Sequence, residues 1–378
     1  MRKRYCVFVM FLVMGIVYVY SQQDSVKTSG FKAYLQSLLN GNVDRTHEKA
    51  MDISFIAAPC YTREGSFGIG GAATALYRLD RNDSIMQPSD LQLMGSATIK
   101  GFYSISLKGN NYFEGNRTRL SYSAEFFHKT LDFWGISYDA CAVNPVSEYV
   151  REQMKVDADY VMKLTDRFRI GGGVVINYST VSHLSALSYL NGQKGRYFFT
   201  GIGLSLQYDT RDFILNPRKG IFFSVREMVY PKILGSYDKT LLATTVQFNA
   251  YHRAWNNAVI GYDLYGKFNS SSAPWSLREE LGSETRRMRG YYSGRYIDCS
   301  QIVSQIELRQ HIMKRVGCVA WVGAGSVFPS LKKFDFGKIL PNYGVGLRIE
   351  IKHNVNMRID YGFGKQTGGF VFQMAEAF

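Results

Sequence analysis

Long hydrophobic runs are missing from this 378-residue chain beyond residue 20, which excludes a membrane protein built from several spanning helices. Mean hydropathy is only −0.15, although 46% of the residues are hydrophobic. Cysteine is scarce as well, because the chain has 5 cysteines and no two of them form a CxxC pair. We therefore expect isolated thiols, with no Cys60–Cys141 bridge and no metal site.

Sequence motifs of enzymes are also lacking. No GxSxG nucleophile elbow, HExxH zinc motif or Walker A loop occurs, and the 6 histidines are scattered. The segment 68–73 imitates a dinucleotide-binding fingerprint, but it lies within an alternating strand pattern and opens no helix. No catalytic residue, cofactor or metal ligand is therefore predicted.

Acidic residues are outnumbered by basic ones, and the formal net charge is +14. The 45 lysines and arginines are spread at strand spacing and form no basic tracts. Nucleic acid is therefore not an expected partner. The charges instead suit a water-filled interior and contacts with anionic lipid headgroups.

The N-terminus has the layout of a secretory signal peptide. Residues 2–4 are all basic, residues 5–20 form an apolar run, and Ser21 closes a plausible cleavage site. Residues 22–50 then form a short tail with apolar side chains at helical spacing and Gly41 as a stop. This tail is either a linker or a short amphipathic helix.

From residue 51 onward the dominant pattern has a period of two. Between Glu148 and Leu164, for example, odd positions are mostly polar and even positions mostly apolar. Side chains at i and i+2 share a face only in a strand, so such segments are strands with one wet side. The strands of a soluble β-sandwich also alternate between polar and apolar residues. Large aromatics on the apolar side, with 26 Tyr and 25 Phe in the chain, favour lipid outside and water inside.

We therefore predict an all-β fold, a transmembrane antiparallel β-barrel of about 16 strands over residues 51–378. Turns that alternate between tight and long support this, since tight turns face the periplasm in such barrels. The first strand (51–61) and the last (369–378) must meet and close the barrel, because an open edge in hydrocarbon leaves backbone groups unpaired.

The end of the chain resembles the C-terminal signal of outer-membrane proteins, which the barrel-assembly machinery recognises. Phe370, Phe372, Met374 and the terminal Phe378 fall on one face of the last predicted strand, and Glu376 interrupts the series. The cell outer membrane of a Gram-negative bacterium is the implied location.

Two motifs resemble those of the BamA/TamA-type outer-membrane superfamily, also called the bacterial surface antigen family. One is similar to that family's periplasmic turn. Its residues are Asp209, Arg211, Asp212, Pro217 and Gly220.

The other is similar to the family's loop motif before the twelfth strand, with the residues Met288, Arg289, Gly290 and Tyr291. Strand motifs that face the lumen in this family are matched around Glu307, Arg309, Arg358 and Asp360.

The resemblance implies that the loop folds back into the barrel. Gly290 would then permit a sharp turn, Tyr291 would pack on the inner wall, and Arg289 would pair with an inward carboxylate, Glu307 being the first candidate. Gly323 stands where family members often carry an Asp, which puts part of this anchoring in question. Residues 22–50 are also too few for the periplasmic POTRA repeat of the assembly members.

The resemblance implies a role in outer-membrane biogenesis, by protein insertion or lipid handling through a lateral seam between the first and last strands. Expected partners are outer-membrane lipids, the barrel-assembly machinery, and client barrels or lipoproteins. A passive pore or structural barrel, plugged by the loop and the tail, is the alternative. An outer-membrane lipid hydrolase is a third hypothesis.

Overall fold

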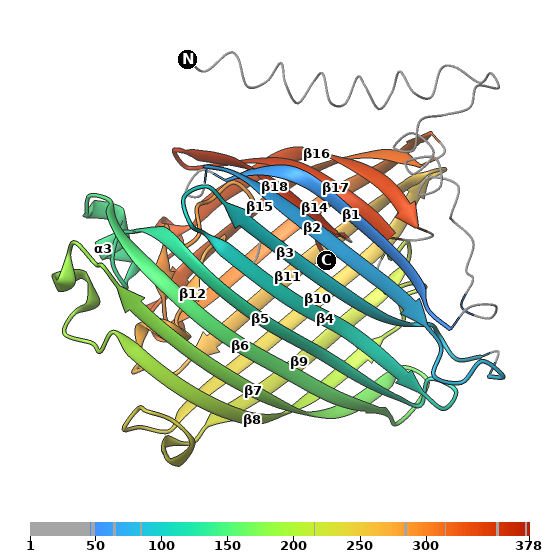
Figure 1. The fold of residues 1–378 in the computed structure, drawn as a ribbon, viewed down its shortest axis with the longest axis horizontal. Helices are drawn as coiled ribbons and strands as arrows, with labels where there is room; N and C mark the ends of the chain where they lie inside the picture. The colour runs from blue at the N-terminus through green and yellow to red at the C-terminus, as the bar shows by residue number, and fades with distance from the viewer. Residues whose placement is uncertain are drawn as a thin grey trace. The chain divides into compact units, whose positions relative to one another are not determined.

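Sixteen antiparallel strands form one sheet, in sequence order, in the computed structural model (Figure 1). The structure describes residues 46, 50–62, 66–83, 85–214, 216–282, 286–313, 315–352, 355–374 and 376–378. The predicted signal peptide lies outside these residues, and so does nearly all of the predicted 22–50 tail.

The strands of the large sheet are 8 to 17 residues long. The first eight are β1 (Asp52–Thr62), β2 (Ser66–Tyr77), β3 (Ser89–Thr98), β4 (Tyr103–Phe113), β5 (Thr118–Phe133), β6 (Ser147–Lys163), β7 (Phe168–Ser182) and β8 (Arg196–Asp209). The second eight are β9 (Gly220–Tyr230), β10 (Leu241–Trp255), β11 (Ala258–Asn269), β14 (Ser300–Met313), β15 (Val316–Phe328), β16 (Leu340–Lys352), β17 (Val355–Gly364) and β18 (Thr367–Met374).

Short elements occupy the longer connections. They are α3 (Tyr138–Val143), η1 (Leu187–Leu190), η2 (Lys232–Leu234), η3 (Trp275–Leu277), η4 (Leu331–Lys333), η5 (Phe336–Lys338) and the two-stranded pair β12 (Glu279–Glu280) and β13 (Ile297–Asp298). Within the described part of the chain, no helix has the length and apolar character needed to cross a membrane.

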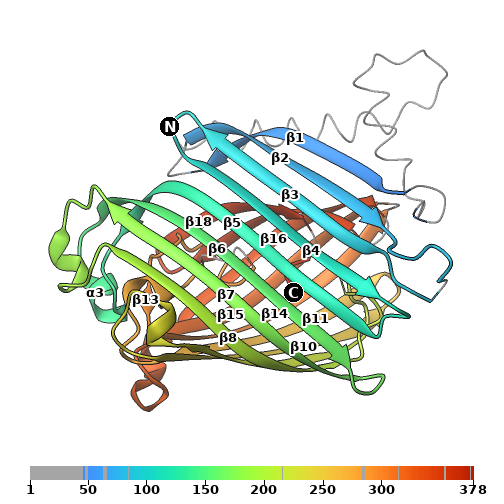
Figure 2. The ribbon, with the colours of Figure 1, turned by 60° about the horizontal axis from the view of Figure 1, so that its bottom comes forward.

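The sheet curves round, so that its first strands come back toward its last ones (Figure 1, Figure 2). This is the predicted all-β antiparallel barrel, with β1 and β18 as the first and last strands of the hydrogen-bonded series. The alternation behind the prediction is visible in β6, where Arg151 is buried while Met154 is 50% exposed. Polar side chains therefore line the interior, and apolar ones cover the outside.

The two ends of the barrel differ in the length of their connections. Residues 114–117, 164–167 and 256–257 are short links at one end, called here the turn end. The other end, called the loop end, carries α3 and the long connection 270–299, which we call loop 270–299. An even number of strands brings the start of β1 and the finish of β18 to the turn end.

The last strand differs from its prediction, which extended it from 369 to the terminal Phe378. β18 stops at Met374, and the final residues turn inward. The carboxylate of Glu376 lies 2.7 Å from Arg348 Nε, and the Phe378 ring stacks on Tyr251 with centroids 6.2 Å apart. A charged side chain is better placed in a polar lumen than against hydrocarbon, and its ion pair draws the chain end inside.

The thiols agree with the prediction where the structure describes them. Cys141 and Cys299 are buried, Cys318 is exposed, and all three are free. The side chain of Cys60 lies outside the described residues.

Candidate functional site: a loop anchored inside the barrel

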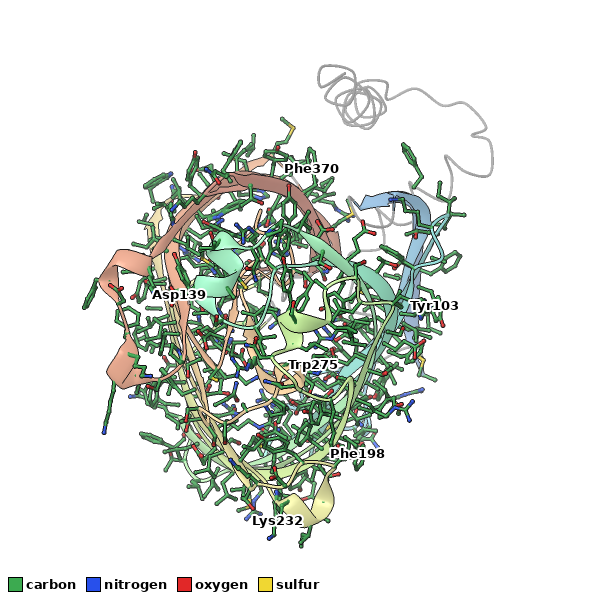
Figure 3. The ribbon with its side chains drawn as sticks, turned by 90° about the vertical axis from the view of Figure 1, so that its left-hand side faces the viewer. Tyr103, Asp139, Phe198, Lys232, Trp275 and Phe370 are labelled. Atoms are coloured by element: carbon green, nitrogen blue, oxygen red, sulfur yellow. The ribbon has the colours of Figure 1, made fainter. Side chains whose placement is uncertain are left out.

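Loop 270–299 crosses the lumen and is fixed to opposite parts of the wall. Glu280 forms a buried ion pair with Arg151 on β6, and Arg287 pairs with Asp263 on β11 at 2.7 Å. The loop also binds β17, through the ion pair of Arg289 with Asp360. β6 and β17 are the sixth and the fifteenth strand of the sheet, so they lie in distant parts of the wall. Figure 3 looks into the loop end and shows Trp275 of this loop inside the ring of strands. The loop therefore bridges the interior.

Arg289 forms the central anchor. Its side chain has no solvent exposure, and its Nη2 and Nη1 atoms lie 2.7 Å from Glu307 Oε2 and 2.8 Å from Asp360 Oδ2. The guanidinium carbon also sits 3.5 Å from the ring centroid of Trp321. Because these three partners belong to β14, β17 and β15, one side chain ties the loop to three strands.

Each of the two carboxylates also holds a second arginine. Glu307 Oε1 accepts from Arg309 Nε at 2.8 Å, and Asp360 Oδ2 accepts from Arg358 Nη1 at 3.2 Å. These four strand residues were predicted to face the lumen. The structure brings them together around Arg289, and the expected contact between Arg289 and Glu307 is present.

The end of the chain completes this cluster, which we call the lumen network. Arg348 donates through Nε to Glu376 at 2.7 Å and through Nη1 to Asp360. Asn356 Nδ2 donates to Glu376 at 2.7 Å, and Arg309 Nη2 donates to the carbonyl oxygen of Phe378 at 3.0 Å. The loop and the chain end are thus held by one set of charges.

Gly290 and Tyr291 fix the position of the loop on the wall. Gly290 has φ +100, and a Cβ there would lie 2.3 Å from the carbonyl oxygen of Gly362, so only glycine fits. The Tyr291 hydroxyl donates to the Pro341 carbonyl at 2.7 Å and accepts from Lys365 N at 2.8 Å. Burial raises the pKa of Tyr291 to about 12, so the hydroxyl stays protonated at physiological pH.

Apolar contacts also hold the loop at the loop end. Met288 is buried and belongs to one cluster with Trp275 and Leu281 of the loop and Tyr149 of β6. Cys141 of α3 joins the same cluster, and burial raises its pKa to about 11. The cluster packs the loop against the barrel wall.

The predicted turn motif forms a tight, self-contained structure at the turn end. Asp209 accepts two bonds from Arg211, both 2.9 Å, and Asp212 Oδ1 caps backbone N–H groups, that of Arg218 at 2.9 Å among them. Pro217 is buried, and Gly220 has φ +107 with its Cβ position 2.3 Å from the Thr210 carbonyl oxygen. These five residues determine the shape of the β8–β9 connection.

The predicted C-terminal signal residues are split between the two faces. Phe370 is 60% exposed and lies at the outer edge of the ring in Figure 3, whereas Phe378 is buried in the lumen. The placement of Phe378 on the same face as Phe370 was therefore wrong. Phe372 and Met374 lie in β18, but their side chains are outside the described part of the structure.

Several members of the site were not predicted from the sequence. They include Trp321, Arg348, Glu376 and Asn342, whose Nδ2 donates to the carbonyl oxygen of Arg289. Each occupies an inward position of its strand or of the chain end. For Glu376 the sequence did carry a signal, because a charged residue interrupts the apolar face of the last predicted strand. At Gly323 a Cβ would lie 2.7 Å from Gln305 Cβ, so a larger side chain has no room. Asp360 provides the second carboxylate for Arg289 instead.

No group of three or more His, Cys, Asp or Glu side chains within the described ranges is arranged to hold a metal ion.

A sixteen-stranded barrel whose lumen holds a docked Arg-Gly-aromatic loop defines a class of outer-membrane protein. The Omp85 superfamily domain matches residues 102–378, and the chain belongs to this family of outer-membrane barrels. No curated protein sequence matches the chain.

Three solved structures share the fold. BamA from Haemophilus ducreyi lacking POTRA domains 1-3 is 12% identical with a TM-score of 0.52, and the match covers 87% of this chain and 70% of that one. CdiB from Acinetobacter baumannii is 11% identical with a TM-score of 0.55, covering 88% and 66%. CdiB from Escherichia coli is 10% identical with a TM-score of 0.57, covering 87% and 63%. The chain thus spans about two thirds of the length of these structures.

Proposed function

We propose that this Omp85 barrel acts in outer-membrane biogenesis, by inserting proteins or handling lipids through the seam between β1 and β18. The observation that carries the proposal is the shortness of the last strand. β18 has 8 residues where β6 has 17, and the chain leaves the wall after Met374 because Glu376 is held in the lumen. One side of the seam therefore offers fewer backbone partners than any other strand of the sheet.

A short edge strand lowers the cost of opening the wall at that place. Backbone groups left unpaired in hydrocarbon cost several kcal/mol each, so an opening is cheapest where the fewest bonds are lost. The exposed edge of β1 can then pair with an incoming strand by β-augmentation. Ile53 and Phe55 on β1 are 60% and 62% exposed, and they present an apolar face to lipid beside this edge.

A disulfide across the seam tests the proposal. A cysteine panel on 52–62 and 367–374, in a background without the native cysteines, yields locked barrels after oxidation. We expect locking to abolish complementation of a deletion strain, read as outer-membrane protein levels and lipid asymmetry, and reduction to restore it. The matched control locks β5 to β6 at the paired positions Ala124 and Val156, and it should complement fully. Full complementation by the barrel with a locked seam would contradict the proposal.

A plugged pore or structural barrel is the second candidate, because loop 270–299 bridges a lumen lined with charged side chains. Under this alternative, planar-bilayer conductance rises when Arg289 is replaced or residues 22–50 are deleted, and locking the seam has no effect. Client proteins and lipoproteins are expected partners under the first proposal. Outer-membrane lipids contact the outer face of the barrel under both. We assign no catalytic role to the barrel.

A further inference from the structure

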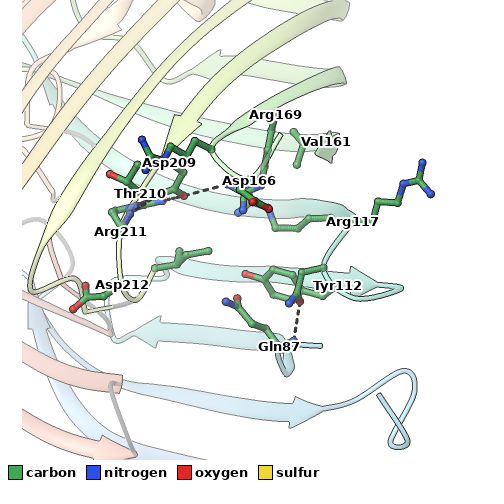
Figure 4. A pocket seen from close by; sticks show the side chains of 14 residues that line it. Gln87, Tyr112, Arg117, Val161, Asp166, Arg169, Asp209, Thr210, Arg211 and Asp212 are labelled. Atoms are coloured by element: carbon green, nitrogen blue, oxygen red, sulfur yellow. Dashed lines mark hydrogen bonds and ion pairs between the residues drawn. The ribbon is translucent and has the colours of Figure 1, made fainter. Parts of the chain in front are cut away.

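A cavity of about 440 Å³ opens on the inner wall at the turn end (Figure 4). Five consecutive strands, β4 to β8, supply one wall residue each. They are Tyr112, Arg119, Val161, Arg169 and Asp209. The residues that line it are different from those of the lumen network, which come from β14 to β17, the chain end and the loop. Its volume is in the range of small-ligand sites, about 300–1,000 Å³.

Positive charge is in excess in this cavity, since five arginines and three aspartates line it, a balance of +2. The aspartates are already engaged. Asp209 is held by both donors of Arg211, Asp212 caps the backbone of its own turn, and Asp166 lies 3.1 Å from the ammonium of Lys163. Little carboxylate capacity remains for the other arginines.

Arg119 and Arg169 have donors that nothing in the described structure satisfies. Nε of Arg119 and Nη1 of Arg169 are buried and make no hydrogen bond to any described residue. Arg119 donates through Nη2 to Gln207 Oε1 at 3.0 Å. Arg169 Nη1 forms an ion pair with Asp209 Oδ2 at 3.6 Å, a separation too long for a hydrogen bond. Buried donors without acceptors are costly, and an acceptor-rich anion removes that cost.

We propose that this cavity binds a phosphate-bearing anion between Arg119 and Arg169. Two guanidinium groups suit phosphate, which accepts several bonds at once from their planar forks. A charge excess of two matches a phosphate dianion. The volume leaves space for an organic portion of about the size of a glycerol group beside the phosphate.

Calorimetry with the purified mature barrel in non-ionic detergent tests the site, with inorganic phosphate and glycerol 3-phosphate as probes. Arg119→Gln and Arg169→Gln should each weaken glycerol 3-phosphate binding at least tenfold. Arg196→Gln is the matched control, because it removes the same charge from an exposed position at the loop end and should leave binding unchanged. Equal affinities in all three variants, or no binding by the unmodified barrel at millimolar phosphate, would overturn the proposal.

A substitution at the rim of the cavity tests the site even if the two arginine variants do not fold. Gln87 lines the cavity at an exposed position, so Gln87→Glu adds a negative charge there without replacing either arginine. It should weaken binding and steepen its dependence on salt. Unchanged binding in this folded variant would count against the site.

The source of the phosphate is resolved by changing the lipid. If the natural ligand is a lipid headgroup, glycerol 3-phosphate should bind more weakly in nanodiscs of phosphatidylglycerol than in nanodiscs of phosphatidylcholine. Equal affinity in both identifies a soluble phosphate compound. Loss of binding in both lipids, with binding in detergent alone, would contradict the proposal.

Discussion

Replacing Arg289 with alanine removes the cation that ties loop 270–299 to the inner wall. Its side chain is fully buried between the carboxylates of Glu307 and Asp360, at 2.7 and 2.8 Å. Breaking a buried ion pair costs about 3–5 kcal/mol, because it leaves a charge without its partner. Both carboxylates keep other arginines here, so the lower end of that range, about 3 kcal/mol, is expected for Arg289→Ala.

Limited proteolysis of the folded barrel in detergent measures this loss. When opening is fast relative to cleavage, the cleavage rate follows the population of undocked loop, and a loss of about 3 kcal/mol raises it roughly 100-fold. Arg286→Ala is the matched control, since Arg286 is an exposed arginine of the same loop. A surface substitution of this kind changes stability by no more than about 0.5 kcal/mol.

Equal cleavage rates for Arg289→Ala and Arg286→Ala would refute the reasoning. That result would mean that the apolar cluster at the loop end, rather than the buried ion pairs, holds the loop in place. A faster cleavage of both variants would point instead to general loosening of the loop.

Three further outcomes follow from the same contacts. Gly290→Ala should undock the loop, since its Cβ would lie 2.3 Å from a carbonyl oxygen, while Gly294→Ala, with its nearest neighbour at 3.6 Å, should raise protease sensitivity less. Burial raises the pKa of Tyr291 to about 12, so the contribution of its hydroxyl to docking is complete below about pH 10 and is lost as the pH rises through 12. Proteolysis at alkaline pH should show this loss in the unmodified protein and not in Tyr291→Phe. Glu376→Gln weakens the pairing that holds the chain end inside, so a spin label at Phe378 should become more mobile, and unchanged mobility would contradict that assignment.

Most of the barrel could be predicted from the sequence because its strands have two chemically different faces. The first strand was expected at 51–61 and is found at Asp52–Thr62, and the number of strands matches. Alternation with a period of two reports the environment of each face directly, so it remains readable wherever lipid and water lie on opposite sides.

The end of β18 could not be predicted in the same way. Counting alternate positions through to Phe378 assumed that the chain stays in the wall. The inward turn depends on Arg348, which is distant in sequence and provides the partner for Glu376. A pattern within one strand carries no information about such a long-range ion pair.

The site was predictable in part for a related reason. Strand alternation placed Glu307 and Asp360 in the lumen, and the family resemblance directed Arg289 toward them. Trp321 and Asn342 have the same inward phase as many other residues of the wall. Only the docked position of the loop selects them, through the stacking of Arg289 on the indole and the bond from Asn342 to the Arg289 carbonyl.

Opening of the seam is most directly tested by the distance between two spin labels in a membrane. Labels at Ile53 on β1 and Phe370 on β18, both 60% exposed, should give two distance populations in pulsed electron paramagnetic resonance spectroscopy. Labels at Phe126 and Met154, which are paired across β5 and β6, should give one. A single narrow distribution across the seam, equal in width to that of the control pair, would contradict a wall that opens between its first and last strands.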